Sequence, residues 1–190
     1  MENRKYVLAS GSPRRIEMMH AHGIIPRVCP ADIDEHMPAA GGPADAVMFL
    51  ALKKAQAAQE TYEIEDGSII IAADTVVYKD VIMGKPSSFD EAFSMLSDLR
   101  GTSHLVITGV ALSEAGHQNA KVFAETTRVF FKNYSDGELA EYLHTDEAYD
   151  KAGGYAIQGY FSRYIEKIEG DYDNVVGFPW ERITSELRNF

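Results

Sequence analysis

The sequence is poor in cysteine and contains no long apolar run, and each shortage excludes a class of protein. Its one cysteine, Cys29, cannot form an intrachain disulfide. No cysteine and histidine pairs occur at zinc-ligand spacing, and no run of eighteen apolar residues could cross a bilayer. The first residues also lack the apolar core of a signal peptide. We therefore expect a soluble, cytoplasmic protein without disulfides, a structural zinc ion or a membrane partner.

Basic residues are also scarce. The chain has 18 lysines and arginines against 29 acidic residues, which gives a net charge of −11. A broad nucleic-acid surface needs clustered basic residues, so this balance disfavours a nucleic-acid partner. If the ligand is an anion, a small group of basic side chains must meet its charge locally, helped by a metal ion.

What the sequence does contain is a strand that looks central. Its 190 residues, of which 45% are hydrophobic, suffice for one domain with a substantial core. Ile69, Ile70 and Ile71 form a continuous apolar run, which is typical of a strand covered on both faces. Asp74 follows at the expected end of this strand. Because an unpaired buried charge is costly, Asp74 is either a paired structural charge or a site residue.

Strand and helix patterns alternate along the rest of the chain. Turn residues and capping signatures divide it into recognisable segments. We expect strands at 6–9 and 160–168, a hairpin at 76–83, a long hairpin formed by 103–112 and 121–132, a turn at 170–174, and helices that start near Pro13, Pro43, Ser88, Ser135 and Pro179.

Two arginines lie where helix stability alone would not place them. Ser12 suits an N-cap and Pro13 the first helical position, so Arg14 and Arg15 fall in the first turn, where the helix dipole disfavours cations. One interpretation is that they bind phosphate together with the free backbone N–H groups. The other is a solvated first turn.

Three further segments contain candidate site residues. The acidic loop with Asp32, Asp34 and Glu35 is either a solvated surface or a source of one Mg²⁺ ligand. Lys53 and Lys54 point about 100° apart on a helix, so only one of them need face a site. Glycines and polar residues alternate over 149–159, as in loops that approach a ligand.

Four motifs together resemble the Maf family of nucleoside triphosphate pyrophosphatases, and their order spans nearly the whole chain. They are Leu8-Ala9-Ser10-Gly11-Ser12-Pro13-Arg14-Arg15, Ala73-Asp74-Thr75 with Gly84-Lys85-Pro86, Asp150-Lys151-Ala152-Gly153-Gly154-Tyr155-Ala156-Ile157-Gln158-Gly159, and Gly177-Phe178-Pro179. The resemblance implies one domain over residues 1–190. It also implies an α/β fold, similar to inosine triphosphate pyrophosphatases, in which helices flank a mixed, partly antiparallel central sheet and two lobes surround a cleft.

The resemblance also implies roles for individual residues. Asp74 is similar to the catalytic base, and Glu35 and Asp74 to the acids that meet a divalent cation, Mg²⁺ or Mn²⁺. The residues implied to contact the substrate are Ser10, Ser12, Arg14, Arg15, Lys54, Thr75, Lys85 and Gln158. Among these, Arg14, Thr75 and Gln158 resemble the subgroup that hydrolyses dTTP and UTP to the monophosphate and pyrophosphate. Modified pyrimidine nucleotides are further candidate substrates, and the family tendency suggests a homodimer.

Two other functions compete with this hypothesis. An acid and a threonine after an apolar strand occur in aspartyl-phosphate phosphatases, but that chemistry wants a second acid where this chain has Val76. A non-catalytic, nucleotide-binding regulator of septum formation is the other alternative. The complete set of charged motif residues argues against a loss of catalysis.

Overall fold

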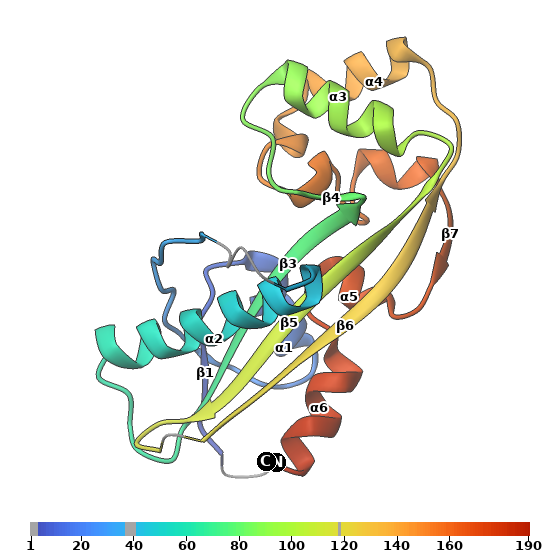
Figure 1. The fold of residues 1–190 in the computed structure, drawn as a ribbon. Coiled ribbons are helices and arrows are strands. Elements are labelled where there is room, and N and C mark those ends of the chain that lie inside the picture. The colour runs from blue at the N-terminus through green and yellow to red at the C-terminus, as the bar shows by residue number, and fades with distance from the viewer. Residues whose placement is uncertain (1–3, 37–40, 118) are drawn as a thin grey trace. The chain divides into compact units, whose positions relative to one another are not determined.

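The computed structural model describes residues 4–36, 41–117 and 119–190 (Figure 1). Its strands are β1 (Tyr6–Leu8), β2 (Arg27–Val28), β3 (Ile69–Lys79), β4 (Val81–Met83), β5 (Ser103–Glu114), β6 (Ala120–Phe131) and β7 (Ile165–Glu169). Its α-helices are α1 (Pro13–Ala21), α2 (Pro43–Thr61), α3 (Phe89–Leu99), α4 (Asp136–Leu143), α5 (Tyr172–Val176) and α6 (Trp180–Arg188). Three short 3-10 helices are η1 (Asp146–Ala148), η2 (Ala152–Gly154) and η3 (Tyr160–Tyr164).

The seven strands form one mixed sheet. Their order is β2-β1-β3-β5-β6-β7, and β4 pairs with β3 outside this path. β1 is parallel to both β2 and β3, whereas β4 and β7 are antiparallel to their partners β3 and β6. The predicted α/β fold, with helices flanking a mixed and partly antiparallel sheet, is confirmed.

The chain divides into two compact units. Unit 1 contains residues 1–74, 108–125 and 177–190, and unit 2 contains residues 75–107 and 126–176. Strands β3, β5 and β6 each contribute residues to both units. The two units have separate cores.

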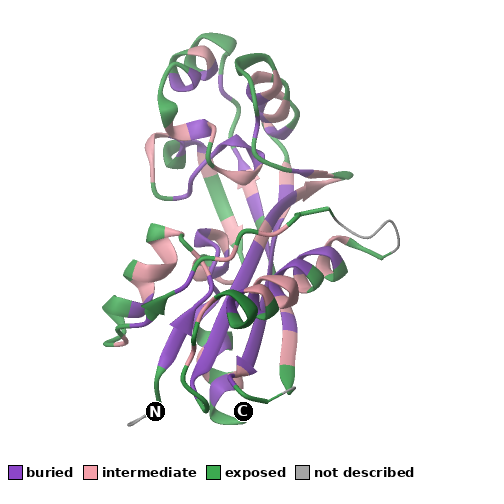
Figure 2. Ribbon diagram, turned by 90° about the vertical axis from the view of Figure 1, so that its left-hand side faces the viewer, coloured by how far each residue is buried: buried purple, intermediate pink, exposed green. Residues whose placement is uncertain are grey.

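The core of unit 1 is mainly aliphatic and lies on both faces of β3. Ile69 and Ile71 belong to one buried cluster, whereas Ile70 and Ala72 belong to another. In Figure 2 the buried residues accordingly run along the strands. This confirms the prediction of a strand covered on both faces. Helix α2 packs closely here, since a Cβ on Gly109 of β5 would lie 2.3 Å from the backbone of Val47.

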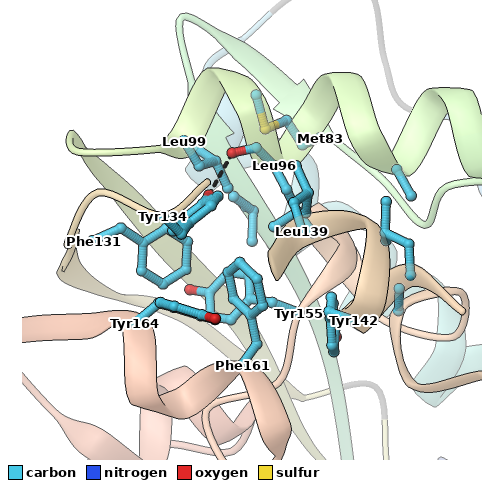
Figure 3. Packing of buried hydrophobic residues seen from close by; sticks show 14 of the residues in the cluster. Met83, Leu96, Leu99, Phe131, Tyr134, Leu139, Tyr142, Tyr155, Phe161 and Tyr164 are labelled. Carbon is cyan, nitrogen blue, oxygen red and sulfur yellow. Dashed lines mark hydrogen bonds between the residues drawn. The ribbon is translucent and has the colours of Figure 1, made fainter. Parts of the chain in front are cut away.

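The core of unit 2 contains a cluster of aromatic rings. Phe161 is fully buried, and the ring centroids of Tyr142, Tyr164, Tyr134 and Phe131 lie 4.7–5.5 Å from its own (Figure 3). Leucines from α3 and α4 fill the space around these rings. Aromatic side chains bury large areas and favour tilted or edge-on contacts, so this cluster is a major stabilising feature of unit 2.

Several local predictions were wrong. The strand around Asp74 does not end there, because β3 continues to Lys79 and pairs with β4. The predicted strand at 160–168 begins as the 3-10 helix η3, and only its second half is β7. In η3 the aromatic residues favour a strand locally, but burial of Phe161 and Tyr164 in the core of unit 2 decides the conformation.

The predicted turn at 170–174 instead leads into the short helix α5. Asn174 in this helix is buried, and its amide group donates hydrogen bonds to the carbonyl of Val106 and the hydroxyl of Thr127. These long-range bonds satisfy a buried amide and stabilise a helix that looks like a surface turn in the sequence. The two-residue strand β2 was not predicted, since a pair of residues shows no periodicity.

The two predicted capping boxes differ. Ser135 and Glu138 at the start of α4 form the reciprocal pair. At α3 the Ser88 hydroxyl accepts a hydrogen bond from the Glu91 amide, but the Glu91 carboxylate binds Ser87 instead of Ser88. Both helices start where predicted.

Candidate active site

The strand order of unit 1 creates a favoured position for a ligand. After β1 the chain passes through α1 to β2 on one side of β1, and then through α2 to β3 on the other side. In parallel sheets, ligands bind beyond the carboxyl ends of the strands where the chain changes direction in this way. β1 ends at Leu8, opposite Ile71, so Ser10 and Asp74 both lie beyond the last paired residues of β1 and β3.

Arg15 connects three segments at this position. Its Nη1 donates hydrogen bonds to the carbonyl of Ala73 (2.7 Å) and to Ser10 Oγ (3.1 Å), and its Nε donates to the carbonyl of Gly177 (2.9 Å). Burial lowers the pKa of Arg15 to about 10, and the nearby charge of Asp74 partly offsets this effect. Arg15 therefore stays protonated near pH 7 and holds the start of α1 against β3.

The start of α1 has the predicted local geometry. Ser12 is the N-cap and Pro13 opens the helix, although the Ser12 side chain makes no capping bond. Ser10 Oγ accepts a hydrogen bond from the Ser12 amide (3.3 Å) in addition to that from Arg15. Arg14 is half-buried, and its side chain, unlike that of Arg15, makes no hydrogen bond or ion pair with the residues that the structure describes.

Lys54 joins two carboxylates. Its Nζ lies 2.6 Å from Asp74 Oδ1 and 2.7 Å from Glu35 Oε1. Asp74 is only 8% exposed, and its buried charge is therefore paired. The neighbouring Lys53 instead donates to the backbone carbonyl of Asp34. Of the two adjacent lysines, the structure places Lys54 against Asp74.

The same contacts distinguish the acids of the loop. Glu35 reaches the ion pair, whereas the Asp34 carboxylate accepts hydrogen bonds from His36. The side chain of Asp32 is exposed. Glu35 is thus the loop acid that, like Asp74, forms an ion pair with Lys54.

These carboxylates fit a divalent cation only together with a substrate. Both oxygens lie within 2.7 Å of one Lys54 nitrogen, so they converge on the same small region. Mg²⁺ is often held by one or two carboxylates plus substrate phosphates. Over residues 4–36, 41–117 and 119–190, no three His, Cys, Asp or Glu side chains form a complete metal site.

The remaining predicted site residues belong to unit 2. Thr75 follows Asp74 on β3 and is half-buried, and Lys85 and Gln158 are exposed. The carbonyl of Gly84 accepts a hydrogen bond from the Gly153 amide (2.9 Å). Within unit 2, the turn that carries Lys85 therefore contacts the segment that leads to Gln158.

Sequence reasoning missed two sets of partners. It singled out Gly177 as part of a motif, but gave no sign that its carbonyl binds Arg15. It also passed over Glu147, whose carboxylate accepts a hydrogen bond from the Tyr160 amide. The residues around Glu147 in the sequence do not indicate this contact, because only the fold brings Glu147 and Tyr160 together.

The fold and this cluster together define an α/β protein with charged side chains just beyond the parallel part of its sheet. A sequence model of the family described as Maf-like protein matches residues 5–190, so the chain belongs to the Maf family. It is 44% identical to the dTTP/UTP pyrophosphatase of Citrifermentans bemidjiense, over 99% of this chain and 96% of the relative. It is 43% identical to the protein of the same name from Bacillus cytotoxicus, over 98% and 96% of the two chains.

Two further observations concern the chain as a whole. The solved structure of the Staphylococcus aureus Ham1 protein matches with a TM-score of 0.45 and 16% identity, over 67% of this chain and 72% of that one. In the part of the chain that the structure describes, none of the helices combines the length and the apolar character needed to cross a membrane.

Proposed function

We propose that this protein hydrolyses dTTP and UTP to the nucleoside monophosphate and pyrophosphate. The observation that carries the proposal is the cluster of Asp74, Lys54 and Glu35 beside the start of α1, at the position that the strand order favours for a ligand. The relatives named dTTP/UTP pyrophosphatase, which match almost the full chain, support it.

The triphosphate is bound by a local concentration of cations. Arg14 and the amides at the start of α1 meet phosphate oxygens, while Arg15 mainly holds this helix start in place through its carbonyl partners. Lys54 sits next to the reacting phosphate and stabilises the charge that develops there. Lys85 is a further cation implied to contact phosphate. These charges allow a chain with a net charge of −11 to bind an anion.

Asp74 is the general base. A water molecule attacks the α-phosphorus in line, Asp74 accepts its proton, and the bond to the pyrophosphate leaving group breaks. Glu35 and Asp74 would hold a divalent cation, Mg²⁺ or Mn²⁺, with substrate oxygens, and such an ion makes a bound water more acidic. Lys54 holds both carboxylates close together before substrate binds.

Thr75 and Gln158 select the base. The Gln158 side chain is exposed and can both donate and accept a hydrogen bond, which matches the imide edge of uracil or thymine. Modified pyrimidines that keep this edge are further substrates. A cytoplasmic location agrees with such a metabolite and with a single, buried and unpaired cysteine.

The test is product analysis by chromatography after incubation with each common nucleoside triphosphate and Mg²⁺ or Mn²⁺. We expect monophosphate and pyrophosphate from dTTP and UTP, and no product after a chelator removes the metal. Release of orthophosphate would instead indicate a phosphatase. Binding of nucleotide without turnover would support the non-catalytic regulator and contradict the proposal.

A matched pair of variants tests the metal ligands. Glu35→Gln should raise the metal concentration needed for half-maximal activity about tenfold, because one of two carboxylates is lost. Asp32→Asn, an equivalent change in the same loop but away from Lys54, should leave it unchanged. An equal effect of both substitutions would contradict the assignment of Glu35.

A further inference from the structure

Glu147 holds both ends of the segment 151–160, which carries Gln158. Both oxygens of its carboxylate accept from the Tyr160 amide, at 3.2 and 3.1 Å. Its backbone carbonyl accepts from Lys151 Nζ at 3.1 Å. One residue from the 3-10 helix η1 therefore contacts the first and the last residue of the segment, within unit 2.

The carboxylate also lies directly against Gly159, the neighbour of Gln158. A Cβ on Gly159 would be 1.6 Å from Glu147 Oε1, so no larger residue fits while Glu147 is in place. The φ angle of Gly159 is −175°, which is extended backbone open to any residue. A side chain at position 159 would therefore displace the Glu147 carboxylate, although the backbone conformation there suits any residue.

The other side of Gln158 is fixed by the core. The Gly154 carbonyl accepts a hydrogen bond from the Tyr142 hydroxyl, and the side chains of Tyr155 and Ile157 are buried. Gln158 itself is exposed. Gln158 thus follows residues that are held by burial and precedes residues that are held by the Glu147 carboxylate. The direction of its side chain depends on both.

We infer that Glu147 is a positioning residue for base selection, acting through Gln158. The inference rests on the proposed function, in which Gln158 recognises the pyrimidine. Without the carboxylate, the Tyr160 amide loses its acceptor and Gln158 samples several directions. Binding of the pyrimidine should then weaken, while the chemical step keeps its rate.

The experiment compares Glu147→Ala and Glu147→Gln with the wild-type protein, using dTTP, UTP and CTP as substrates. In Glu147→Ala we expect KM for dTTP and UTP to rise about tenfold with kcat nearly unchanged, because loss of a charge-assisted hydrogen bond is worth roughly that factor. Selectivity against CTP, which lacks the imide edge, should fall. Glu147→Gln keeps an acceptor for the Tyr160 amide and should restore most of the affinity.

Glu141→Ala serves as the matched control, since Glu141 is an exposed acid on the neighbouring helix α4. Hydrogen exchange gives a readout that does not need activity: the Tyr160 amide should lose protection in Glu147→Ala and keep it in Glu147→Gln and Glu141→Ala. If Glu147→Ala does not fold, Glu147→Asp, whose side chain is one methylene shorter, takes its place in both measurements.

The outcomes separate the two proposals. A wild-type protein that hydrolyses no nucleotide overturns the proposed function, and base selection by Glu147 with it. An active wild-type protein whose folded Glu147→Ala variant keeps its KM and its selectivity overturns the role of Glu147 alone. Equal losses of kcat for all three substrates would show a purely structural role and would also overturn the inference.

Discussion

The two units bury polar groups in different ways. In unit 1 the buried carboxylate of Asp74 forms an ion pair with Lys54, which also pairs with Glu35. In the core of unit 2 the hydroxyl of Tyr134 donates to the carbonyl of Leu96 (Figure 3), and the Tyr142 hydroxyl and the Asn174 amide likewise bind backbone carbonyls.

We expect this difference to separate residues that contribute to activity from residues that contribute to stability. A buried ion pair gains little free energy over a hydrophobic alternative, because both charges must leave water. A buried neutral group with a backbone partner costs less and orders the core. We therefore expect substitutions at the charged cluster of unit 1 to affect activity most, and substitutions in the core of unit 2 to affect stability most.

The sharpest test of this contrast is Asp74→Asn. The amide oxygen still accepts a hydrogen bond from Lys54, but the side chain no longer accepts a proton from water. We expect kcat/KM for dTTP to fall by about 10³-fold or more. The free energy of unfolding, measured with denaturant, should change by no more than about 1 kcal/mol. A folded variant with wild-type turnover would show that Asp74 is not the base.

Lys54 offers a second test with an adjacent control. Lys54→Gln removes the cation that joins Asp74 to Glu35, and we expect kcat/KM to fall by roughly 100-fold. Lys53→Gln removes only a contact with the Asp34 carbonyl, and should change kcat/KM by about twofold or less. Comparable losses in the two variants, measured by steady-state kinetics, would contradict the assignment of Lys54.

The pH dependence of stability at His104 tests the expectation that the core of unit 2 contributes to stability. This residue is 2% exposed, its Nε2 lies 2.6 Å from the Tyr155 hydroxyl, and burial lowers its pKa from 6.5 to about 3. Because the unfolded chain binds the proton more readily, stability should fall as the pH drops below 6.5, and the loss should continue to about pH 3. The contribution is on the order of 2–3 kcal/mol between pH 7 and pH 4.

The measurement compares wild type with His104→Gln, by denaturant unfolding at several pH values. Glutamine can still bind the Tyr155 hydroxyl but takes up no proton, so the variant should lose less stability in acid than the wild type. Parallel pH profiles of the two proteins would show that His104 does not titrate on unfolding.

Tyr134→Phe should have the smallest effect of these substitutions. In contrast to Asp74→Asn, it should lower stability and leave activity unchanged. It removes the hydroxyl that binds the Leu96 carbonyl and leaves the ring packed against Phe161. We expect the free energy of unfolding to fall by about 1 kcal/mol and kcat/KM to stay unchanged. Thermal unfolding and steady-state kinetics on the same preparation test this prediction. A loss of activity without a loss of stability would contradict the expected difference between the two units.

The sequence predicted most of the elements, because their signals are local. The isoleucine run, the caps at Ser12 and Ser135 and the two hairpins all depend on neighbouring residues. The segments at 160–164 and 172–176 were misread because their conformation depends on burial in a core assembled from distant parts of the chain. Local propensity is a weak guide wherever such packing opposes it.

By itself, the sequence determined which kinds of residue are available: a set of motifs with an acid after a buried strand, arginines at a helix start and a glutamine in a glycine-rich segment. Only the tertiary structure decided which of them meet. It selected Lys54 over Lys53 and Glu35 over Asp34, turned Arg15 toward backbone carbonyls, and brought Glu147 to Tyr160. The physical reason is that these contacts join residues on different elements, and the strand order and the packing of the core, which no short stretch of sequence encodes, determine their distances.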